Sequence, residues 1–180
     1  MEHNMNISSY LVIAAGVIGT LGLLAFTLPQ KVHVEREAII QAEPEEIFVL
    51  ASSNKGFQAF NPYKSIDPDL KIEFFGPEVG VGSGFHFDGK DGKDGKGTQT
   101  ISSLEANQSV TMQIDLGAKG APTQTFNFHK VPAGTRVVWG LDADFGNNPI
   151  GRIIGLFMDK MMGETFERGL NNLSVAVASK

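Results

Sequence analysis

The chain has 180 residues, contains no cysteine and carries a formal net charge of −5 at pH 7. The lack of cysteine excludes disulfides, a thiolate nucleophile and metal sites built on sulfur. All 15 Lys and Arg residues and 19 of the 20 Asp and Glu residues lie at Lys31 or later, so this part carries a net charge of −4. A mildly acidic domain without a basic stripe argues against nucleic-acid binding.

An uncharged apolar segment precedes this acidic part. The segment from Ile7 to Leu28 has 22 residues without a charged side chain, and a helix of that length spans the roughly 30 Å hydrocarbon core of a bilayer. A cleaved signal would need a basic leader and a small-x-small cleavage site, whereas no Lys or Arg precedes the segment and Ala25-Phe26-Thr27 is a poor match. The sequence therefore predicts a single-pass membrane anchor over residues 1–30 and one domain over residues 31–180.

Small residues line one side of the predicted anchor, at Ala15, Gly19 and Gly22. Such a side lets a transmembrane helix of a larger complex approach closely, although glycine is also common in membrane helices in general. Lys31 and Arg36 follow the segment and no basic residue precedes it. The positive-inside rule then favours a cytoplasmic domain, but two charges leave the side of the membrane open.

The domain opens with a predicted strand and a short helix. Residues 32–40 alternate between apolar and polar side chains, and Arg36 is the one exception on the apolar side. Pro44 and the two glutamates after it suit the first turn of a helix, which we expect to end near Ser52.

Period-two alternation dominates the middle of the chain. Phe57 and Phe60 first indicate a second helical turn, which Asn61-Pro62 ends. Six short strands with tight connections then predict an antiparallel meander. These strands are expected at residues 72–75, 84–88, 98–104, 110–116, 123–131 and 135–145.

The C-terminal tail changes to helical spacing. We expect one long helix over residues 150–177 that lies on the apolar face of the sheet, and lone glycines within it mean that tertiary contacts must hold it. Its apolar side is predicted to comprise Ile150, Ile154, Phe157, Met158, Met161, Phe166, Leu170 and Leu173.

The order of these elements and several short stretches resemble the START-like (SRPBCC) superfamily of polyketide cyclases, birch-pollen-allergen-like proteins and lipid-transfer domains. The resemblance implies an α+β helix-grip fold, in which a curved antiparallel sheet grips the C-terminal helix around an apolar cavity. The matching stretches are Val34-Glu35-Arg36, residues 42–48, Asn61-Pro62, residues 80–83, residues 134–139 and residues 166–173.

The loop from Asp88 to Thr98 repeats Asp, Gly and Lys. An EF-hand needs oxygen ligands at every second position, but these aspartates recur at every third. A phosphate-binding P-loop fails as well, because Gly97 separates Lys96 from Thr98. A solvated hairpin tip is the better interpretation, and the sequence predicts neither a metal site nor a cofactor.

The histidines His33, His86 and His129 each alternate with apolar neighbours. If those neighbours face the cavity, the histidines face away from it, which argues against a catalytic or metal-binding histidine cluster.

Aromatic and methionine side chains supply most of the apolar volume. They form either a filled core or the lining of a ligand pocket, and the resemblance favours the pocket as strongly as the core. The predicted ligand-binding residues are Phe57, Phe60, Phe85, Phe87, Met112, Phe126, Phe128, Trp139, Met158 and Met161.

The leading hypothesis is a membrane-tethered binding or carrier domain for a hydrophobic small molecule of the lipid, quinone or isoprenoid class. One alternative is an accessory subunit of a larger membrane complex. Another is a cyclase, dehydratase or hydrolase, which needs an acid or base in the pocket and for which the sequence offers His86, Arg136 and Asp142.

Overall fold

The computed structural model describes residues 24–90 and 95–179, together with residues 10, 11, 16, 19 and 22. Most of the predicted anchor, including Ala15, lies outside the described residues, so the anchor stays a prediction. Residues 91–94 at the tip of the Asp-Gly-Lys loop also lie outside them. Within the part of the chain that is described, no helix combines the length and the apolar composition that a membrane crossing requires.

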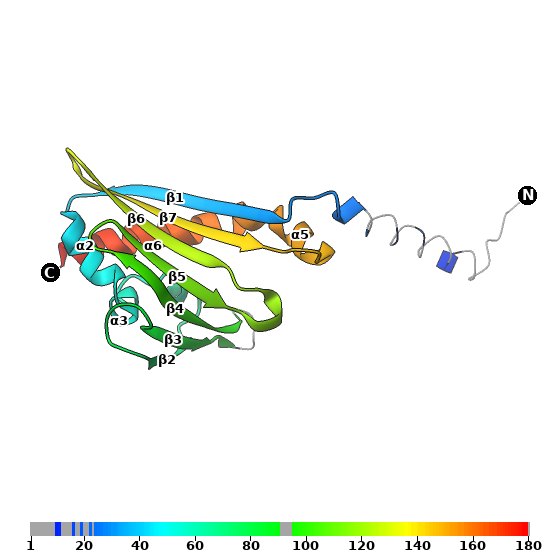
Figure 1. Cartoon of the computed structure of the whole chain (residues 1–180), viewed down its shortest axis with the longest axis horizontal. Coiled ribbons are helices and arrows are strands. Elements are labelled where there is room, and N and C mark those ends of the chain that lie inside the picture. The colour runs from blue at the N-terminus through cyan, green and yellow to red at the C-terminus, as the bar shows by residue number, and fades with distance from the viewer. Residues whose placement is uncertain are drawn as a thin grey trace, which may run out of the picture.

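Seven antiparallel strands form one curved sheet in the order β1-β7-β6-β5-β4-β3-β2 (Figure 1). Strands β2 to β7 pair in chain order, each with its neighbour in the sequence, which confirms the predicted meander. The first strand forms one edge of the sheet and pairs with β7 over its whole length. The strands are β1 (Lys31–Ile40), β2 (Lys71–Phe75), β3 (Gly84–Asp88), β4 (Lys96–Glu105), β5 (Ser109–Asp115), β6 (Thr123–Val131) and β7 (Gly134–Asp144).

The helices lie at the two ends of the sheet and across one face. Helix α6 runs over that face, α2 lies at the end where the chain terminates, and α5 lies at the end from which the N-terminal segment extends (Figure 1). This confirms the predicted α+β architecture of a curved sheet with a long C-terminal helix. The helices are α2 (Pro44–Ala51), α3 (Asn54–Phe57), α4 (Tyr63–Ile66), α5 (Pro149–Gly155) and α6 (Met158–Ala178), with a 3-10 turn η2 (Gly117–Lys119).

Two helical predictions need correction. The second helical turn ends before Asn61-Pro62 as predicted, but the prediction missed α4, which Pro62 caps because a fixed φ near −70° suits a helix N-terminus. The single C-terminal helix is two helices, because α5 ends at Gly155, a weak helix former, and α6 begins at Met158.

The predicted apolar side of the tail is also partly wrong. Phe166, Leu170 and Leu173 are buried against the sheet as expected, whereas four residues nearer the start of the tail face outward. These four are Ile150, Ile154, Phe157 and Met161. Helical spacing assumes one uninterrupted helix. Because the helix is interrupted between α5 and α6, residues before the break do not share the buried side of residues after it.

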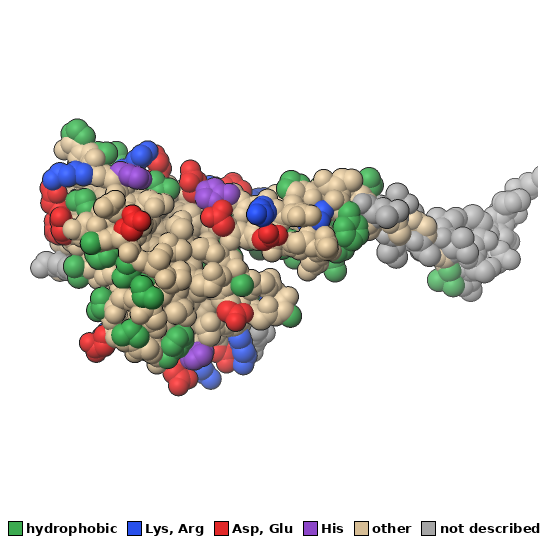
Figure 2. All heavy atoms as spheres, viewed as in Figure 1, with side chains coloured by type: hydrophobic (Ala, Val, Ile, Leu, Met, Phe, Trp, Pro, Cys, Tyr) green, Lys and Arg blue, Asp and Glu red, His purple; other side chains and the backbone are tan. Residues whose placement is uncertain are grey.

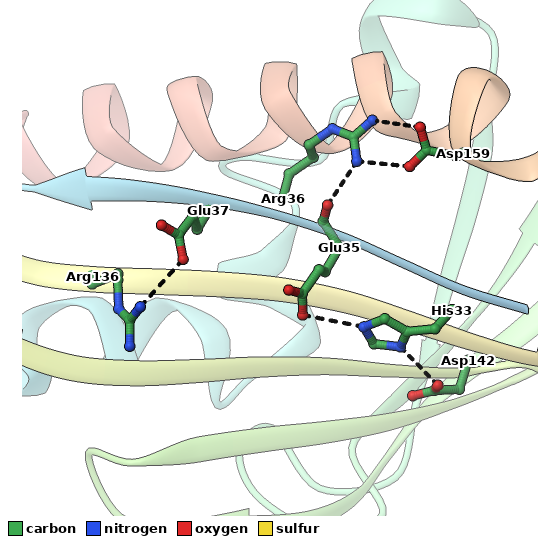
Figure 3. Close-up of polar contacts among 7 residues, drawn as sticks. All are labelled: His33, Glu35, Arg36, Glu37, Arg136, Asp142 and Asp159. Carbon is green, nitrogen blue, oxygen red and sulfur yellow. Dashed lines mark hydrogen bonds and ion pairs between the residues drawn. The ribbon is translucent and has the colours of Figure 1, made fainter.

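Arg36, the exception in the alternation of β1, faces α6. Its guanidinium binds both carboxylate oxygens of Asp159 at 2.8 and 3.1 Å (Figure 3). Its Nε donates to Oε1 of Glu167 at 2.9 Å. Gly163 lies between these two carboxylates on α6, where a Cβ atom would overlap the guanidinium. The arginine lowers the pKa of Asp159. Arg36 thus joins β1 to α6 by ion pairs, which explains a polar residue on the apolar side of the strand.

Trp139 on β7 lies flat against α6 at Gly169. Its ring stacks on Phe166 with a centroid separation of 4.9 Å and an interplanar angle of 12°. A Cβ atom at Gly169 would overlap the indole ring. The glycine therefore lets the helix approach the tryptophan closely.

Gly169→Ala is expected to lower the free energy of unfolding. Alanine favours a helix over glycine by about 1 kcal/mol, but overpacking a buried core costs about 1–3 kcal/mol, and the added Cβ atom would overlap the fully buried indole ring. Urea unfolding should therefore show a net loss. Gly163→Ala on the same helix is the comparison, because there the atoms nearest to the added Cβ belong to the guanidinium at the end of the Arg36 side chain and not to a ring in the core. A stability gain for Gly169→Ala would contradict the close fit.

Candidate functional site

The three domain histidines are exposed, as predicted, and belong to the outer face of the sheet. They lie on β1, β3 and β6 and do not come together. Among the residues that the structure describes, no group of three His, Cys, Asp or Glu side chains could hold a metal ion.

His33 on this outer face lies between two carboxylates. Its Nδ1 is 2.8 Å from Asp142 and its Nε2 is 3.1 Å from Glu35 (Figure 3). The hydrogen bonds to Asp142 and then to Glu35 raise the pKa of His33 above its ordinary value of 6.5. Both ring nitrogens have a carboxylate partner, so the protonated imidazole bridges β1 and β7.

This bridge predicts a pH dependence of stability. Because folding raises the pKa, the contribution of His33 is complete below about pH 6.5 and is lost as the pH rises through the folded pKa. Solvent screening keeps it below about 1 kcal/mol. Urea unfolding of the wild type and of His33→Asn should show a difference near pH 6 that shrinks toward about pH 9. His129→Asn is the control, since no described residue forms an ion pair with His129, and a constant difference for His33→Asn would contradict the prediction.

Most of the predicted ligand-binding residues meet between the sheet and α6. Seven of the ten are buried there, Phe87 and Met158 are half-buried, and Met161 is exposed. Whether they bind a ligand stays a prediction. The seven buried residues are Phe57, Phe60, Phe85, Met112, Phe126, Phe128 and Trp139.

Aromatic rings fill the centre of this interior. The ring centroid of Trp139 lies 4.6 Å from that of Phe126 and 6.1 Å from those of Phe57 and Phe60. Phe57 and Phe60 come from the short segment that contains α3, so this segment covers one end of the interior. Phe166 was not among the predicted ligand-binding residues, but its stacking on Trp139 places it in the same cluster.

Buried amides lie beside the aromatic rings. Gln99 donates to Oδ1 of Asn54 at 3.2 Å and to the sulfur of Met112 at 3.0 Å, and Asn54 donates to the carbonyl of Ser83 at 2.5 Å. Gln124 reaches the same sulfur at 3.5 Å. Both glutamines are almost fully buried. The prediction missed them, although each is in phase with the apolar residues of its strand, and that is the signal which could have found them.

Two buried side-chain nitrogen atoms have no hydrogen-bond partner among the described residues, Nε1 of Trp139 and Nε2 of Gln58. The side chain of Trp139 is fully buried. A buried donor without a partner costs about 1–3 kcal/mol. The indole N–H is enclosed by four phenylalanine rings, so a ligand would have to displace some of these rings to bring an acceptor to it.

Two hollows open on the surface beside β2 and β3. One of about 660 Å³ has an apolar floor that includes Ile72, Phe87 and Leu116, with charged residues at its border, and one of about 230 Å³ lies around Phe74 and Phe75. Of the predicted ligand-binding residues only Phe87 borders either hollow. Because the other predicted ligand-binding residues lie away from both hollows and most of them meet in the interior, we take the interior around Trp139 as the candidate site.

The three candidates for acid or base catalysis lie on the surface. His86, Arg136 and Asp142 are exposed, Arg136 pairs with Glu37 at 3.5 Å, and Asp142 binds His33. None of the three lies beside Trp139, so the structure brings no predicted catalytic residue to the interior site.

Comparison with known proteins gives a family and a fold. The family model described as "Polyketide cyclase / dehydrase and lipid transport" matches residues 31–178. Comparison with curated proteins gives no match.

Solved structures with the same fold differ in function. A protein of unknown function from Staphylococcus aureus is 14% identical with a TM-score of 0.60, over 83% of this chain and 94% of that chain. Norcoclaurine synthase from Thalictrum flavum, in complex with dopamine and hydroxybenzaldehyde, is 14% identical with a TM-score of 0.62, over 83% and 87%. The di-domain ARO/CYC protein StfQ of the steffimycin biosynthetic pathway is 10% identical with a TM-score of 0.61, over 83% and 51%. At these identities the likeness concerns the fold alone.

Proposed function

Because the chain belongs to the polyketide cyclase / dehydrase and lipid transport family, we propose that it binds a hydrophobic small molecule between its sheet and α6. The observation that carries the proposal is the fully buried N–H of Trp139, which has no acceptor among the described residues. An orphan donor inside an aromatic cluster costs stability, and a ligand that accepts its hydrogen bond removes that cost.

The surroundings of Trp139 define the chemistry of the ligand. Aromatic rings favour a flat or branched apolar body, and the indole N–H favours one carbonyl or ether oxygen on that body. The amides of Gln99 and Gln124 offer further polar contacts on the same side of the sheet. A quinone, an isoprenoid or another lipid with a carbonyl group meets these requirements.

Binding without catalysis is the activity that this interior supports best. Acid–base chemistry needs a positioned titratable group within hydrogen-bond reach of the ligand. The side chains in ring contact with Trp139 are those of Phe57, Phe60, Phe126 and Phe166, and the predicted acids and bases lie on the surface. The enzyme alternative therefore receives no support from the residues that it would need.

The uncharged segment Ile7–Leu28 supports a membrane location for this binding domain. A hydrophobic ligand of the proposed class dissolves in the bilayer, so an anchor of about 22 residues would hold the domain beside its supply. We include this tether in the proposal as an expectation from the sequence.

Two measurements on the full-length chain test the proposal. The protein, purified in detergent, is extracted with organic solvent, and co-purifying molecules are identified by mass spectrometry. Trp139 is the only tryptophan of the chain, so a titration with a short-chain quinone should quench its emission in a saturable way. A purified protein that carries no ligand and whose emission does not respond to quinones, prenols or fatty acids would refute the proposal.

A further inference from the structure

The exposed side of α5 and of the start of α6 is apolar. Ile150 is 69% exposed, Leu156 57% and Met161 59%. Figure 2 shows hydrophobic side chains gathered at the end of the domain from which the N-terminal segment extends. We define the α5 patch as Ile150, Ile153, Ile154, Leu156, Phe157 and Met161, all of which are exposed.

Helix α5 turns its glycines toward the domain and its large side chains away from it. A Cβ atom at Gly151 would lie 2.6 Å from the ring of Phe145, and one at Gly155 would lie 2.9 Å from Val32. Surface helices normally place their large apolar residues against the core. In α5 the arrangement is reversed, because the helix packs on Phe145 and Val32 through its glycines. The large side chains of the α5 patch are therefore left exposed and can contact an apolar partner.

The helix that carries most of the α5 patch is bound to the end of the N-terminal segment. Arg152 of α5 is buried, and its Nη1 donates to the carbonyls of Phe26 and Leu28 at 2.5 and 3.3 Å. Its guanidinium also lies 5.5 Å from the ring centroid of Phe26. The residues that join the uncharged segment to the domain are therefore fixed against the helix that carries the patch.

Charge around the patch favours a lipid surface. Between Pro149 and Met162 the exposed charged side chains are those of Asp159, which Arg36 neutralises, and Lys160. An apolar helix face with a lysine at its rim suits the boundary between acyl chains and anionic headgroups.

We propose that the α5 patch lies in the headgroup–acyl boundary of the bilayer that segment 7–28 enters. The domain would then lie on the membrane through a second contact. This inference rests on the tether in the proposed function, but not on ligand binding.

Single-cysteine spin labels test the proposal, because the chain has no cysteine of its own. Labels are placed at Ile150→Cys, Leu156→Cys and Met161→Cys in the full-length chain in vesicles of phosphatidylcholine and phosphatidylglycerol. Val49→Cys on α2 and Val175→Cys near the end of α6 are matched controls, with exposed fractions of 61% and 59%. We expect the three patch labels to lose access to a water-soluble nickel chelate and gain access to oxygen, while both controls stay accessible to the chelate.

The outcomes separate the two proposals. Vesicle flotation of the full-length chain tests the tether independently, and the tryptophan titration tests ligand binding. A chain that floats with vesicles but leaves the patch labels as accessible as the controls overturns the patch proposal and keeps the tether. A chain that does not float overturns both the tether and the patch. Spin–spin broadening at the patch identifies a second copy as the occupant and also overturns the proposal.

Discussion

Trp139→Ala is expected to remove about 3–5 kcal/mol from the free energy of unfolding, the usual cost of deleting a buried large aromatic side chain. The ring contacts Phe166, Phe126, Phe57 and Phe60, so its loss opens a cavity at the centre of the interior. A domain of this size is stable by about 5–15 kcal/mol. Urea unfolding should therefore show the loss of a large part of this stability, and a loss below about 2 kcal/mol would contradict the central position of the indole.

Trp139→Phe separates the packing role of this side chain from its hydrogen-bonding role. The substitution keeps an aromatic ring and removes the unpartnered N–H, whose burial costs about 1–3 kcal/mol in the unliganded protein. The stability loss should therefore be much smaller than for alanine, because the removed penalty offsets part of the lost packing. Affinity for a carbonyl ligand should nevertheless fall, by up to about tenfold for one neutral hydrogen bond.

Ligand affinity must be measured without tryptophan emission, because Trp139→Phe removes the one tryptophan of the chain. Equilibrium dialysis or mass spectrometry of retained ligand measures it in the wild type and in Trp139→Phe. Phe126→Leu is a matched control, since it perturbs the same cluster and leaves the indole N–H in place. An unchanged affinity for Trp139→Phe would show that the N–H does not contact the ligand.

Arg152→Ala is expected to release the residues before β1 from α5 and to cost about 2–3 kcal/mol. The guanidinium donates to three carbonyls, those of Phe26, Leu28 and Gly146, with the Gly146 bonds at 2.7 and 2.9 Å. Hydrogen bonds from a charged donor contribute about 1.5–3 kcal/mol each, and their loss leaves carbonyls without partners. Thermal unfolding and limited chymotrypsin cleavage near Phe26 measure the global and the local effect.

Arg152→Lys is the informative comparison for this site. Lysine keeps the positive charge, but its single ammonium cannot span carbonyls on two chain segments as the planar guanidinium does. We expect cleavage near Phe26 to stay faster than in the wild type and stability to recover only in part. A lysine variant that matches the wild type would mean that charge alone, and not the fork of donors, holds this junction.

The strands were predictable because their signal is local. Alternation requires only neighbouring residues, and Val110, Met112, Val137 and Trp139 are all buried as their pattern indicates. The same pattern singled out Arg36 as an exception but did not reveal its partners. Asp159 and Glu167 lie more than 120 residues further along the chain, and only the folded structure brings them to the arginine.

The orientation of α5 was less predictable, because it depends on how closely the backbone of this helix packs against the domain. Helical spacing groups Ile150 with Ile154, yet it does not tell which side of α5 meets the domain. That choice is made by Gly151 and Gly155, whose missing side chains leave room for Phe145. The unpartnered N–H of Trp139 is beyond any sequence pattern, since it reflects the lack of an acceptor among the described residues once the chain has folded.

The junction before β1 limits how the domain can move. Only Pro29 and Gln30 separate Leu28 from Lys31, and the carbonyl of Gln30 accepts a hydrogen bond from the N–H of Phe145 at 2.8 Å. With Leu28 held by Arg152 as well, the chain has no slack between the proposed anchor and the sheet. A tethered domain built in this way has almost no reach, so it would exchange its ligand with molecules at a fixed height above the bilayer and would not ferry it across a distance.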